Sequence, residues 1–196
     1  MDGLSDPVSA AFHAMAREEF LPPAARGHAR YDGPVPIGHG QTCSQPRTVA
    51  AMLRLLDVRP GHRVLDVGAG SGWTTALLGH LVGADGSVVG VELVAELAAS
   101  AEVNVRRTSG PWATVRKAAD SVLGVPEEGP YDRILVSADG GEVPQTLLDQ
   151  LGDPGRMVLP AAGVMTVVDR VDGEDRVSRH GRYRFVPLVR PAIGPA

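Results

Sequence analysis

The stretch RVLDVGAGSGWTTALLGHLVGADGSVVGVEL, which runs from Arg63 to Leu93, decides the fold class of this chain. It opens with a short β-branched run that ends at Asp66 and Val67 and is typical of a buried parallel strand. Three glycines then follow at every second position: Gly68, Gly70 and Gly72. Apolar residues recur at helical spacing from Trp73 to Leu81, and a second apolar strand, 87–91, ends at Glu92. Strand, glycine turn, helix, strand and acid together predict one mononucleotide-binding βαβ half.

The spacing of the glycines differs from that of a dinucleotide-binding loop, whose third glycine stands three positions after the second. Here Trp73 occupies that position, and the glycine comes one residue earlier. Such a turn still lets a ligand lie against the backbone, because no Cβ intervenes. Glu92, at the tip of the second strand, would accept hydrogen bonds from two ribose hydroxyls. We therefore interpret the loop as a ligand site, with a glycine-rich turn of purely structural use as the alternative.

This arrangement resembles the S-adenosylmethionine-binding motif of class I methyltransferases. The resemblance implies an α/β fold with a Rossmann-like sheet that is mostly parallel and has helices on both faces. It also implies a set of cofactor-binding residues: Gln41, Thr42, Asp66, Gly68, Ala69, Gly70, Ser71, Gly72, Trp73, Glu92, Leu93, Asp120, Ser121 and Ser137. Asp66 could equally fix the loop through backbone amides without touching the cofactor, and Trp73 could belong partly to the core.

The segments AMAREEFLP (residues 14–22), YD (31–32) and PIGHGQTCSQP (36–46) carry a more specific resemblance. They are similar to the N-terminal signature of protein-L-isoaspartate O-methyltransferases, and the similarity continues to RFVPL at 184–188. The resemblance implies a carboxyl O-methyltransferase that acts on L-isoaspartyl residues of damaged proteins or peptides, as a repair enzyme. Its cofactor would be S-adenosyl-L-methionine, and S-adenosyl-L-homocysteine would be the product.

The resemblance also assigns roles around the methyl acceptor. Ser44 would orient the acceptor carboxylate through its hydroxyl, with Thr42 and Gln41 closing over the cofactor. The substrate-binding residues would be Thr42, Ser44, Ala138, Asp139 and Val186. Ser44 has an alternative use as a cap of the helix that begins at Pro46. The backbone from Phe185 to Leu188 would hold an extended peptide by strand-like hydrogen bonds.

Three positions depart from the family pattern, one of them being Cys43, which stands where a larger aliphatic residue is typical. Asp139-Gly140-Gly141 stands where the family has small apolar residues, and a second carboxylate there would repel the acceptor unless it is neutralised or turned away. Asp120-Ser121 replaces an Asp-Gly pair near the adenine. Two alternatives therefore stay open: a relative that esterifies a different carboxylate of a modified peptide or small molecule, and a cofactor-binding module without turnover.

Periodicity and turn residues predict the remaining elements, with a long irregular connection over residues 22–45. The expected helices are 7–20, 46–56, 96–103 and 144–151. The expected strands are 114–117, 131–136, 156–159, 164–170 and a last one at 183–189. This order predicts an open α/β sheet with an antiparallel C-terminal edge. We expect one domain, 1–196, made of N-terminal helices and a covering loop (1–60), a cofactor-binding core (61–160) and a C-terminal hairpin (161–196).

Composition limits the remaining possibilities. A length of 196 residues suits a single domain, and a net charge of −4 gives no reason to expect nucleic acid as a partner. Cys43 is the single cysteine, and the six histidines show no metal-ligand spacing with it, so we expect no metal. No run approaches the length of a membrane span and the N-terminus does not resemble a signal peptide. We expect a cytoplasmic protein whose partner is a peptide or protein substrate, and the oligomeric state stays open.

Overall fold

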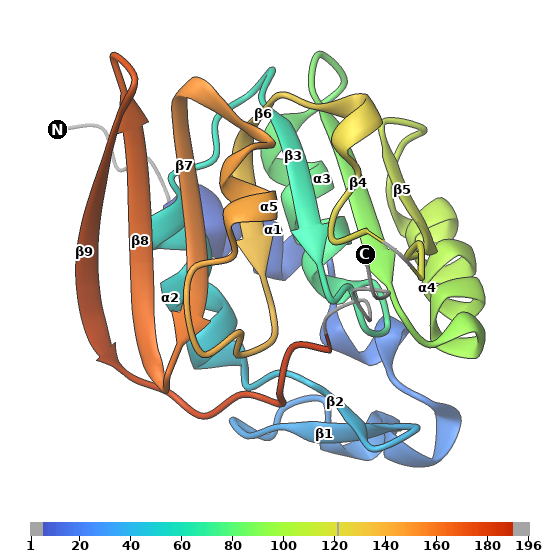
Figure 1. Cartoon of the computed structure of the whole chain (residues 1–196). Coiled ribbons are helices and arrows are strands. Elements are labelled where there is room, and N and C mark those ends of the chain that lie inside the picture. The colour runs from blue at the N-terminus through green and yellow to red at the C-terminus, as the bar shows by residue number, and fades with distance from the viewer. Residues whose placement is uncertain (1–5, 121, 190–196) are drawn as a thin grey trace, which may run out of the picture.

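A seven-stranded sheet forms the centre of the computed structural model, which describes residues 6–120 and 122–189 (Figure 1). The strand order is β5-β4-β3-β6-β7-β8-β9. The strands are β3 (Arg63–Val67), β4 (Ser87–Glu92), β5 (Ala113–Lys117), β6 (Tyr131–Val136), β7 (Leu151–Ala161), β8 (Val164–Val171) and β9 (Glu174–Arg182). Pairs from β5 to β7 are parallel, and β7–β8 and β8–β9 are antiparallel. The predicted fold class, with its antiparallel C-terminal edge, is confirmed.

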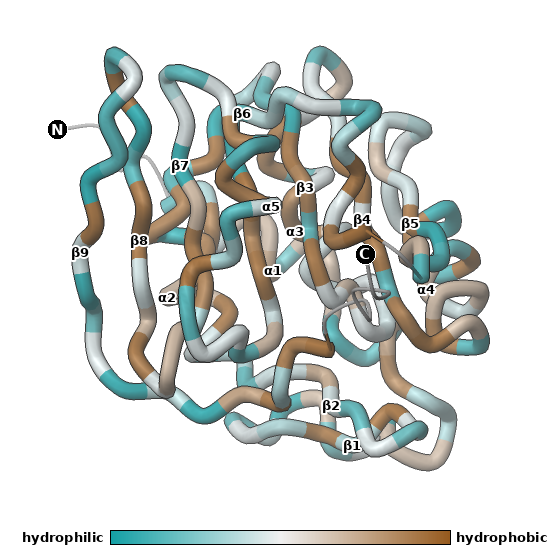
Figure 2. Tube along the Cα trace, viewed as in Figure 1, coloured by the Kyte–Doolittle hydropathy of each residue, from teal (hydrophilic) through white to brown (hydrophobic). Residues whose placement is uncertain are grey.

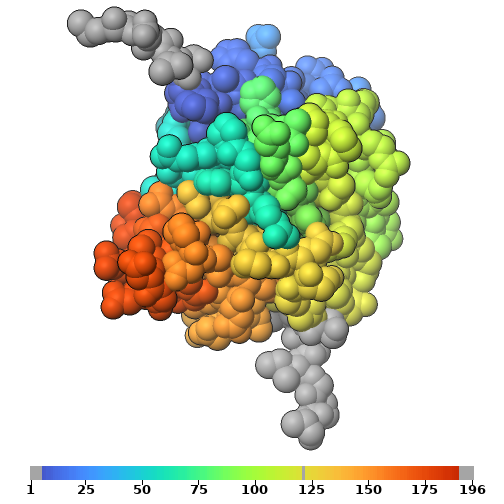
Figure 3. All heavy atoms as spheres, turned by 90° about the horizontal axis from the view of Figure 1, so that it is seen from above, coloured from blue at the N-terminus to red at the C-terminus, as the bar shows by residue number. Residues whose placement is uncertain are grey.

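The helices cover the two faces of the sheet unequally. The longer ones are α1 (Pro7–Ala14), α2 (Pro46–Leu56), α3 (Trp73–Val82) and α4 (Ala95–Thr108), and their buried side chains belong to one hydrophobic cluster. The cluster on the other face contains the short α5 (Gln145–Leu148) and Val125. In Figure 3 the N-terminal segments, coloured blue, accordingly gather on one side of the molecule. A separate hairpin, β1 (Val35–Gly38) with β2 (Gln41–Cys43), lies below the sheet in Figure 1.

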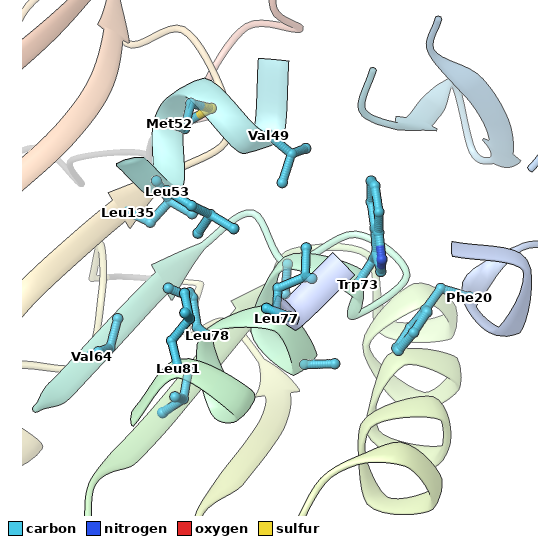
Figure 4. Close-up of a cluster of buried hydrophobic side chains, with 14 of the residues drawn as sticks. Phe20, Val49, Met52, Leu53, Val64, Trp73, Leu77, Leu78, Leu81 and Leu135 are labelled. Carbon is cyan, nitrogen blue, oxygen red and sulfur yellow. The ribbon is translucent and has the colours of Figure 1, made fainter. Parts of the chain in front are cut away.

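Helix α3 occupies the centre of the larger cluster. Nine of its ten residues are buried, because the sheet, α1 and α4 contact it from different sides. Figure 4 shows Leu77, Leu78 and Leu81 of this helix facing Val64 of β3 and neighbouring apolar side chains. Burying one such leucine side chain contributes roughly 1.5–3 kcal/mol. Figure 2 shows the same pattern in hydropathy, with hydrophobic residues along the middle strands and mostly hydrophilic ones along β9.

The predicted helix 7–20 is wrong in its second half. α1 ends at Ala14, and residues Arg17–Phe20 form a separate 3₁₀ turn, η1. Two tertiary interactions accompany the break in the helix. The carbonyl of Met15 accepts a hydrogen bond from the Trp73 indole, and the side chain of Arg17 is buried. The expected irregular connection 22–45 also contains regular structure, namely the β1–β2 hairpin and a 3₁₀ turn, η2 (Pro23–His28). A third such turn, η3 (Pro126–Glu128), precedes β6.

Several element boundaries also differ from the prediction. α4 continues to Thr108 instead of ending at 103, and α5 ends at Leu148 because β7 already begins at Leu151. The last strand is 174–182, not 183–189. Every residue of β9 is exposed, so this strand carries no apolar alternation that would have marked it. The residues after it run to the loop that follows β6, where Pro187 forms an isolated bridge with Asp139.

Gly72 fixes the approach of α4 to the glycine turn. Its φ is +89°, and a Cβ there would lie 2.9 Å from Val105 Cγ2 and 3.0 Å from the Ala101 carbonyl oxygen. Gly61 has a similar φ of +86° with open space around a Cβ. We expect Gly61→Ala to cost about 1–2 kcal/mol from the left-handed backbone alone, and Gly72→Ala about 1–3 kcal/mol more from overpacking. Urea unfolding of both variants measures the difference, and equal losses would show that α4 packing is not the reason for Gly72.

Candidate active site

A cavity of about 920 Å³ opens at the carboxyl ends of the parallel strands. Its wall includes Gly68 directly after β3, Glu92 at the end of β4 and Ser137 directly after β6. The β1–β2 hairpin and residues 182–189 complete the wall. Ligands of open α/β sheets bind at this edge, so the cavity is the candidate active site.

Most residues that the sequence singled out meet in this cavity. Those that line it are Gln41, Thr42, Ser44, Gly68, Ala69, Gly70, Ser71, Trp73, Glu92, Leu93, Asp120, Ser137, Ala138 and Val186. Asp66, Gly72 and Asp139 do not line it, and Ser121 lies outside the described residues. Asp120 lines the cavity with its carboxylate bound to Lys117 Nζ at 2.6 Å.

Glu92 is held in place by the backbone of the glycine turn. Its Oε2 accepts a hydrogen bond from the Gly70 amide at 2.8 Å, and its Oε1 accepts one from the Val94 amide at 3.0 Å. Each carboxylate oxygen has a further lone pair, so Glu92 can still accept two hydroxyl donors. Beside it Leu93 is 39% exposed in the cavity wall, which gives an apolar surface next to a polar one.

Asp66 lies beneath the glycine turn with no exposed surface. Its Oδ2 accepts a hydrogen bond from the Thr75 hydroxyl at 2.7 Å, and its Oδ1 has no partner among the described residues. Burial raises the pKa of this carboxyl to about 6, with Glu92 adding to the rise and the hydroxyls of Thr75 and Thr74 opposing it. The partner of Asp66 is thus a side chain of α3, and not the loop amides that one interpretation expected.

Arg17 organises the loop that covers the cavity. Its side chain is 6% exposed, and its guanidinium lies 5.4 Å from the centroid of the Trp73 ring. The guanidinium donates to four carbonyl oxygens at 2.8–2.9 Å: those of Tyr31, Gly33, Cys43 and Ser44. One buried cation therefore ties the two ends of the β1–β2 hairpin to η1.

Trp73 serves the core more than the cavity. It is 3% exposed, its indole N–H donates to the carbonyl of Met15 at 2.9 Å, and its ring meets Phe12 edge-on. The alternative that places Trp73 partly in the core therefore agrees with these contacts, although the residue also contributes to the cavity wall.

Ser44 lies in the cavity wall with an uncommitted hydroxyl. Its carbonyl accepts from Arg17, but its Oγ makes no hydrogen bond with any described residue. The alternative role as a helix cap is not what the structure has, since the N-cap of α2 is Gln45 and the side chain that accepts from the first turn, at the Arg47 amide, is that of Asp32. Thr42, two residues earlier on β2, is exposed in the same cavity.

Asp139 does not place its carboxylate in the cavity, so the repulsion expected from sequence does not arise. Its Oδ1 accepts from the amides of Gly141 and Ala162, and its Oδ2 accepts from the amide of Gly163 at 2.7 Å. Burial acts to raise its pKa, but these three amides hold the pKa below its usual value. Asp139 is therefore turned away and fixes the turn between β7 and β8.

The backbone of Asp139 also engages the segment that was expected to hold a peptide. Its amide donates to the Val186 carbonyl and its carbonyl accepts from the Leu188 amide, both at 2.8 Å. These two groups are thus committed within the chain, although the side chain of Val186 still lines the cavity.

Sequence reasoning missed four arginines. Arg17 is quoted in the signature but was expected on a helix, and its burial is visible only in the folded chain. Arg47, Arg182 and Arg184 line the cavity. The last two lie in a stretch whose secondary structure was wrongly predicted, and no local pattern marks them as cavity residues.

Comparison with known proteins gives a consistent result. A family model described as protein-L-isoaspartate(D-aspartate) O-methyltransferase (PCMT) matches residues 2–192. The protein-L-isoaspartate O-methyltransferase of Methanopyrus kandleri is 45% identical, over 94% of this chain and 84% of its own length. That of Aeropyrum pernix is 42% identical, over 93% and 72%.

Solved structures agree with the sequence comparisons. The protein-L-isoaspartate O-methyltransferase of Plasmodium falciparum, in complex with S-adenosyl-L-homocysteine, matches with a TM-score of 0.80 at 28% identity. The match covers 95% of this chain and 91% of that one.

Within the described ranges, none of the helices combines the length and hydropathy that a membrane span requires.

The Arg17 network predicts a large loss of stability on substitution. Arg17→Met would leave buried carbonyls without a donor, at about 1–3 kcal/mol for each one that water does not reach. We expect urea unfolding to show a loss of at least about 3 kcal/mol, with faster hydrogen exchange over residues 33–44. The control Arg107→Ala removes a half-exposed pair with Glu19 and should cost about 1 kcal/mol or less. Equal losses in the two variants would contradict the assigned role.

The raised pKa of Asp66 predicts a pH-dependent cost. Below about pH 4 the carboxyl is protonated in both folded and unfolded chains, so there is no cost. As the pH rises towards 6, the unfolded chain releases the proton and the folded chain keeps it, so stability falls; above 6 the cost is constant. Asp66→Asn keeps a neutral side chain at every pH. Its free energy of unfolding, compared with that of the parent chain, should therefore rise by up to roughly 3 kcal/mol as the pH goes from 4 to 7.

Asp57 provides a control of opposite sign. Burial acts to raise its pKa, but Arg59 holds the pKa below its usual value. The stability that Asp57 contributes is therefore present above its unfolded pKa and lost as the pH falls. Asp57→Asn should lose stability against the parent chain as the pH rises. Urea unfolding across this range checks both variants, and a flat difference for Asp66→Asn would contradict the retained proton.

Proposed function

Because the chain belongs to the protein-L-isoaspartate(D-aspartate) O-methyltransferase family, and is therefore a methyltransferase, we propose that it esterifies the free carboxylate of L-isoaspartyl residues in proteins or peptides, with S-adenosyl-L-methionine as the methyl donor. The observation that carries the proposal is the uncommitted Ser44 hydroxyl in one cavity with Glu92 and the glycine turn.

The residues of the cavity fit the cofactor. A Cβ at Gly70 would meet only Ile37 Cδ1, at 3.4 Å, so the wall there is bare backbone against which a ligand can lie. Glu92 would accept the ribose hydroxyls, and Leu93 offers the apolar surface that a purine needs. When bound, the cofactor supplies an electrophilic methyl group.

The acceptor needs no general base. The free carboxyl of an isoaspartyl residue is an α-carboxyl with a pKa of about 3.5, so it is ionised at neutral pH and is already a nucleophile. The protein's contribution is to position it and to remove part of its water. Ser44 would donate a hydrogen bond to one carboxylate oxygen, which leaves the other free to attack, and Thr42 would support it.

Esterification then permits repair. The neighbouring backbone amide nitrogen can attack the uncharged ester carbonyl, lose its proton and expel methanol, which forms a succinimide; an ionised carboxylate resists this attack because its carbon is a poor electrophile. Hydrolysis of the succinimide regenerates some normal aspartyl residues. The alternative acceptor, a different carboxylate, rested on repulsion by Asp139, and the three amides that hold this side chain remove that support.

A paired-peptide assay tests the proposal. Peptides that differ only in isoaspartate or aspartate at one site are incubated with labelled S-adenosylmethionine, and base-labile label is counted. We expect label on the isoaspartyl peptide alone. Label on the aspartyl peptide alone, or on neither peptide, would overturn the proposed substrate.

Ser44→Ala tests the assigned catalytic residue. Loss of one hydrogen bond to a charged acceptor should lower kcat/KM by roughly 10- to 100-fold, since such bonds contribute about 1.5–3 kcal/mol. Binding of S-adenosyl-L-homocysteine, measured by calorimetry, should change little. Ser100→Ala is the matched control, because Ser100 Oγ bonds only the Glu96 carbonyl on the exposed face of α4. Full activity of Ser44→Ala would contradict the role.

A further inference from the structure

Three arginines at the C-terminal end of the sheet have no acidic partner among the residues that the structure describes. Residues 176–184, RVSRHGRYR, carry four arginines in a chain whose net charge is −4. Arg176 pairs with Glu174 at 3.5 Å. Arg179, Arg182 and Arg184 make no ion pair or side-chain hydrogen bond with any described residue, and all three are exposed.

Two of these arginines belong to the active-site cavity. Arg182 and Arg184 line it, together with Arg47 from the first turn of α2. Arg47 is 84% exposed and pairs with Asp32 at 3.0 Å, so its charge is partly balanced. The charges of Arg182 and Arg184 are not balanced by any side chain of the described chain.

The strand order gives the cavity a basic end and an acidic end. Its two carboxylates are those of Glu92, the last residue of β4, and Asp120, which follows the neighbouring edge strand β5. Arg182 ends β9, the strand at the opposite edge, and Arg184 follows it. The methyl donor would occupy the β4 side, so the acceptor peptide enters from the side of the arginines.

Resting on the proposed function, we propose that Arg182 and Arg184 bind acidic side chains of the substrate that flank the acceptor residue, so that the protein selects isoaspartyl sites in acidic sequences. A guanidinium group can bind a carboxylate with two parallel hydrogen bonds. Arg182 and Arg184 have no ion-pair partner among the described residues, so both are free to bind a carboxylate of the substrate. Arg179, three residues before Arg182 on β9, is a third exposed basic side chain at this edge of the sheet.

The test uses three isoaspartyl peptides that differ only two positions before and after the acceptor, with Glu, Gln or Lys there. We expect KM for the Glu peptide to be roughly three- to tenfold lower than for the Gln peptide, the range that two exposed ion pairs give. The Lys peptide should bind most weakly. The preference should shrink between low salt and about 0.3 M salt, because exposed charges are screened.

Variants assign the preference to these residues. In the double variant Arg182→Gln/Arg184→Gln, the ratio of KM for the Gln peptide to KM for the Glu peptide should fall to about one. The double variant Arg182→Lys/Arg184→Lys should retain much of this ratio. Arg176→Gln, on the same strand but paired with Glu174, should keep the full ratio. Fluorescence anisotropy of labelled peptides in the presence of S-adenosyl-L-homocysteine gives the same comparison without turnover.

Three outcomes would overturn the inference. Equal KM values for the Glu and Gln peptides would remove the subsite while leaving the proposed function intact. A preference that survives in Arg182→Gln/Arg184→Gln would assign it to other residues. Methylation of none of the peptides would overturn the proposed function and this inference together.

Discussion

The buried guanidinium of Arg17 is the interaction on which the covering loop depends. A cation out of contact with water is costly unless its donors are satisfied, and here four backbone carbonyls and the face of Trp73 surround it. The same contacts explain the end of α1, because a continuous helix would carry Arg17 away from the hairpin. The hydrogen bonds of Arg17 also fix the position of Ser44, since the Ser44 carbonyl is one of the four acceptors.

The sheet supplies the other part of the cavity wall. Glu92 and the glycine turn are fixed by short-range backbone contacts, in which the end of β4 bonds the turn after β3. The covering hairpin is fixed by contacts with residues distant in sequence: carbonyls at its two ends accept from Arg17, and Val35, Ile37 and Cys43 are buried in the larger hydrophobic cluster. The two halves of the cavity thus differ in how they are held: local backbone bonds secure one half, and long-range contacts secure the other.

The parts that sequence predicted well are those whose signal is local. The βαβ half, α2, β5 and β6 show periodicity, glycines or proline at their own positions, and Ser44 and Glu92 lie inside compact motifs. The break after Ala14 could not be found in this way, because its cause lies in contacts with residues far along the chain. The strand β9 was missed for a different reason: both its faces are exposed, so selection for burial left no pattern in it. Because of that error, Arg182 and Arg184 were not recognised as cavity residues. The direction of the Asp139 side chain depends on the amides of Ala162 and Gly163, which only folding brings close to it.

The segment after β9 has a consequence for the order of events during synthesis. Residues 182–189 cross beneath the sheet and are pinned to Asp139, and they supply one wall of the cavity. The glycine turn and Glu92 emerge from a ribosome about a hundred residues earlier. A nascent chain can therefore form the part of the cavity wall around Glu92 while the part that residues 182–189 supply does not yet exist. The cavity is complete only once residues 182–189 have been added and have folded against Asp139.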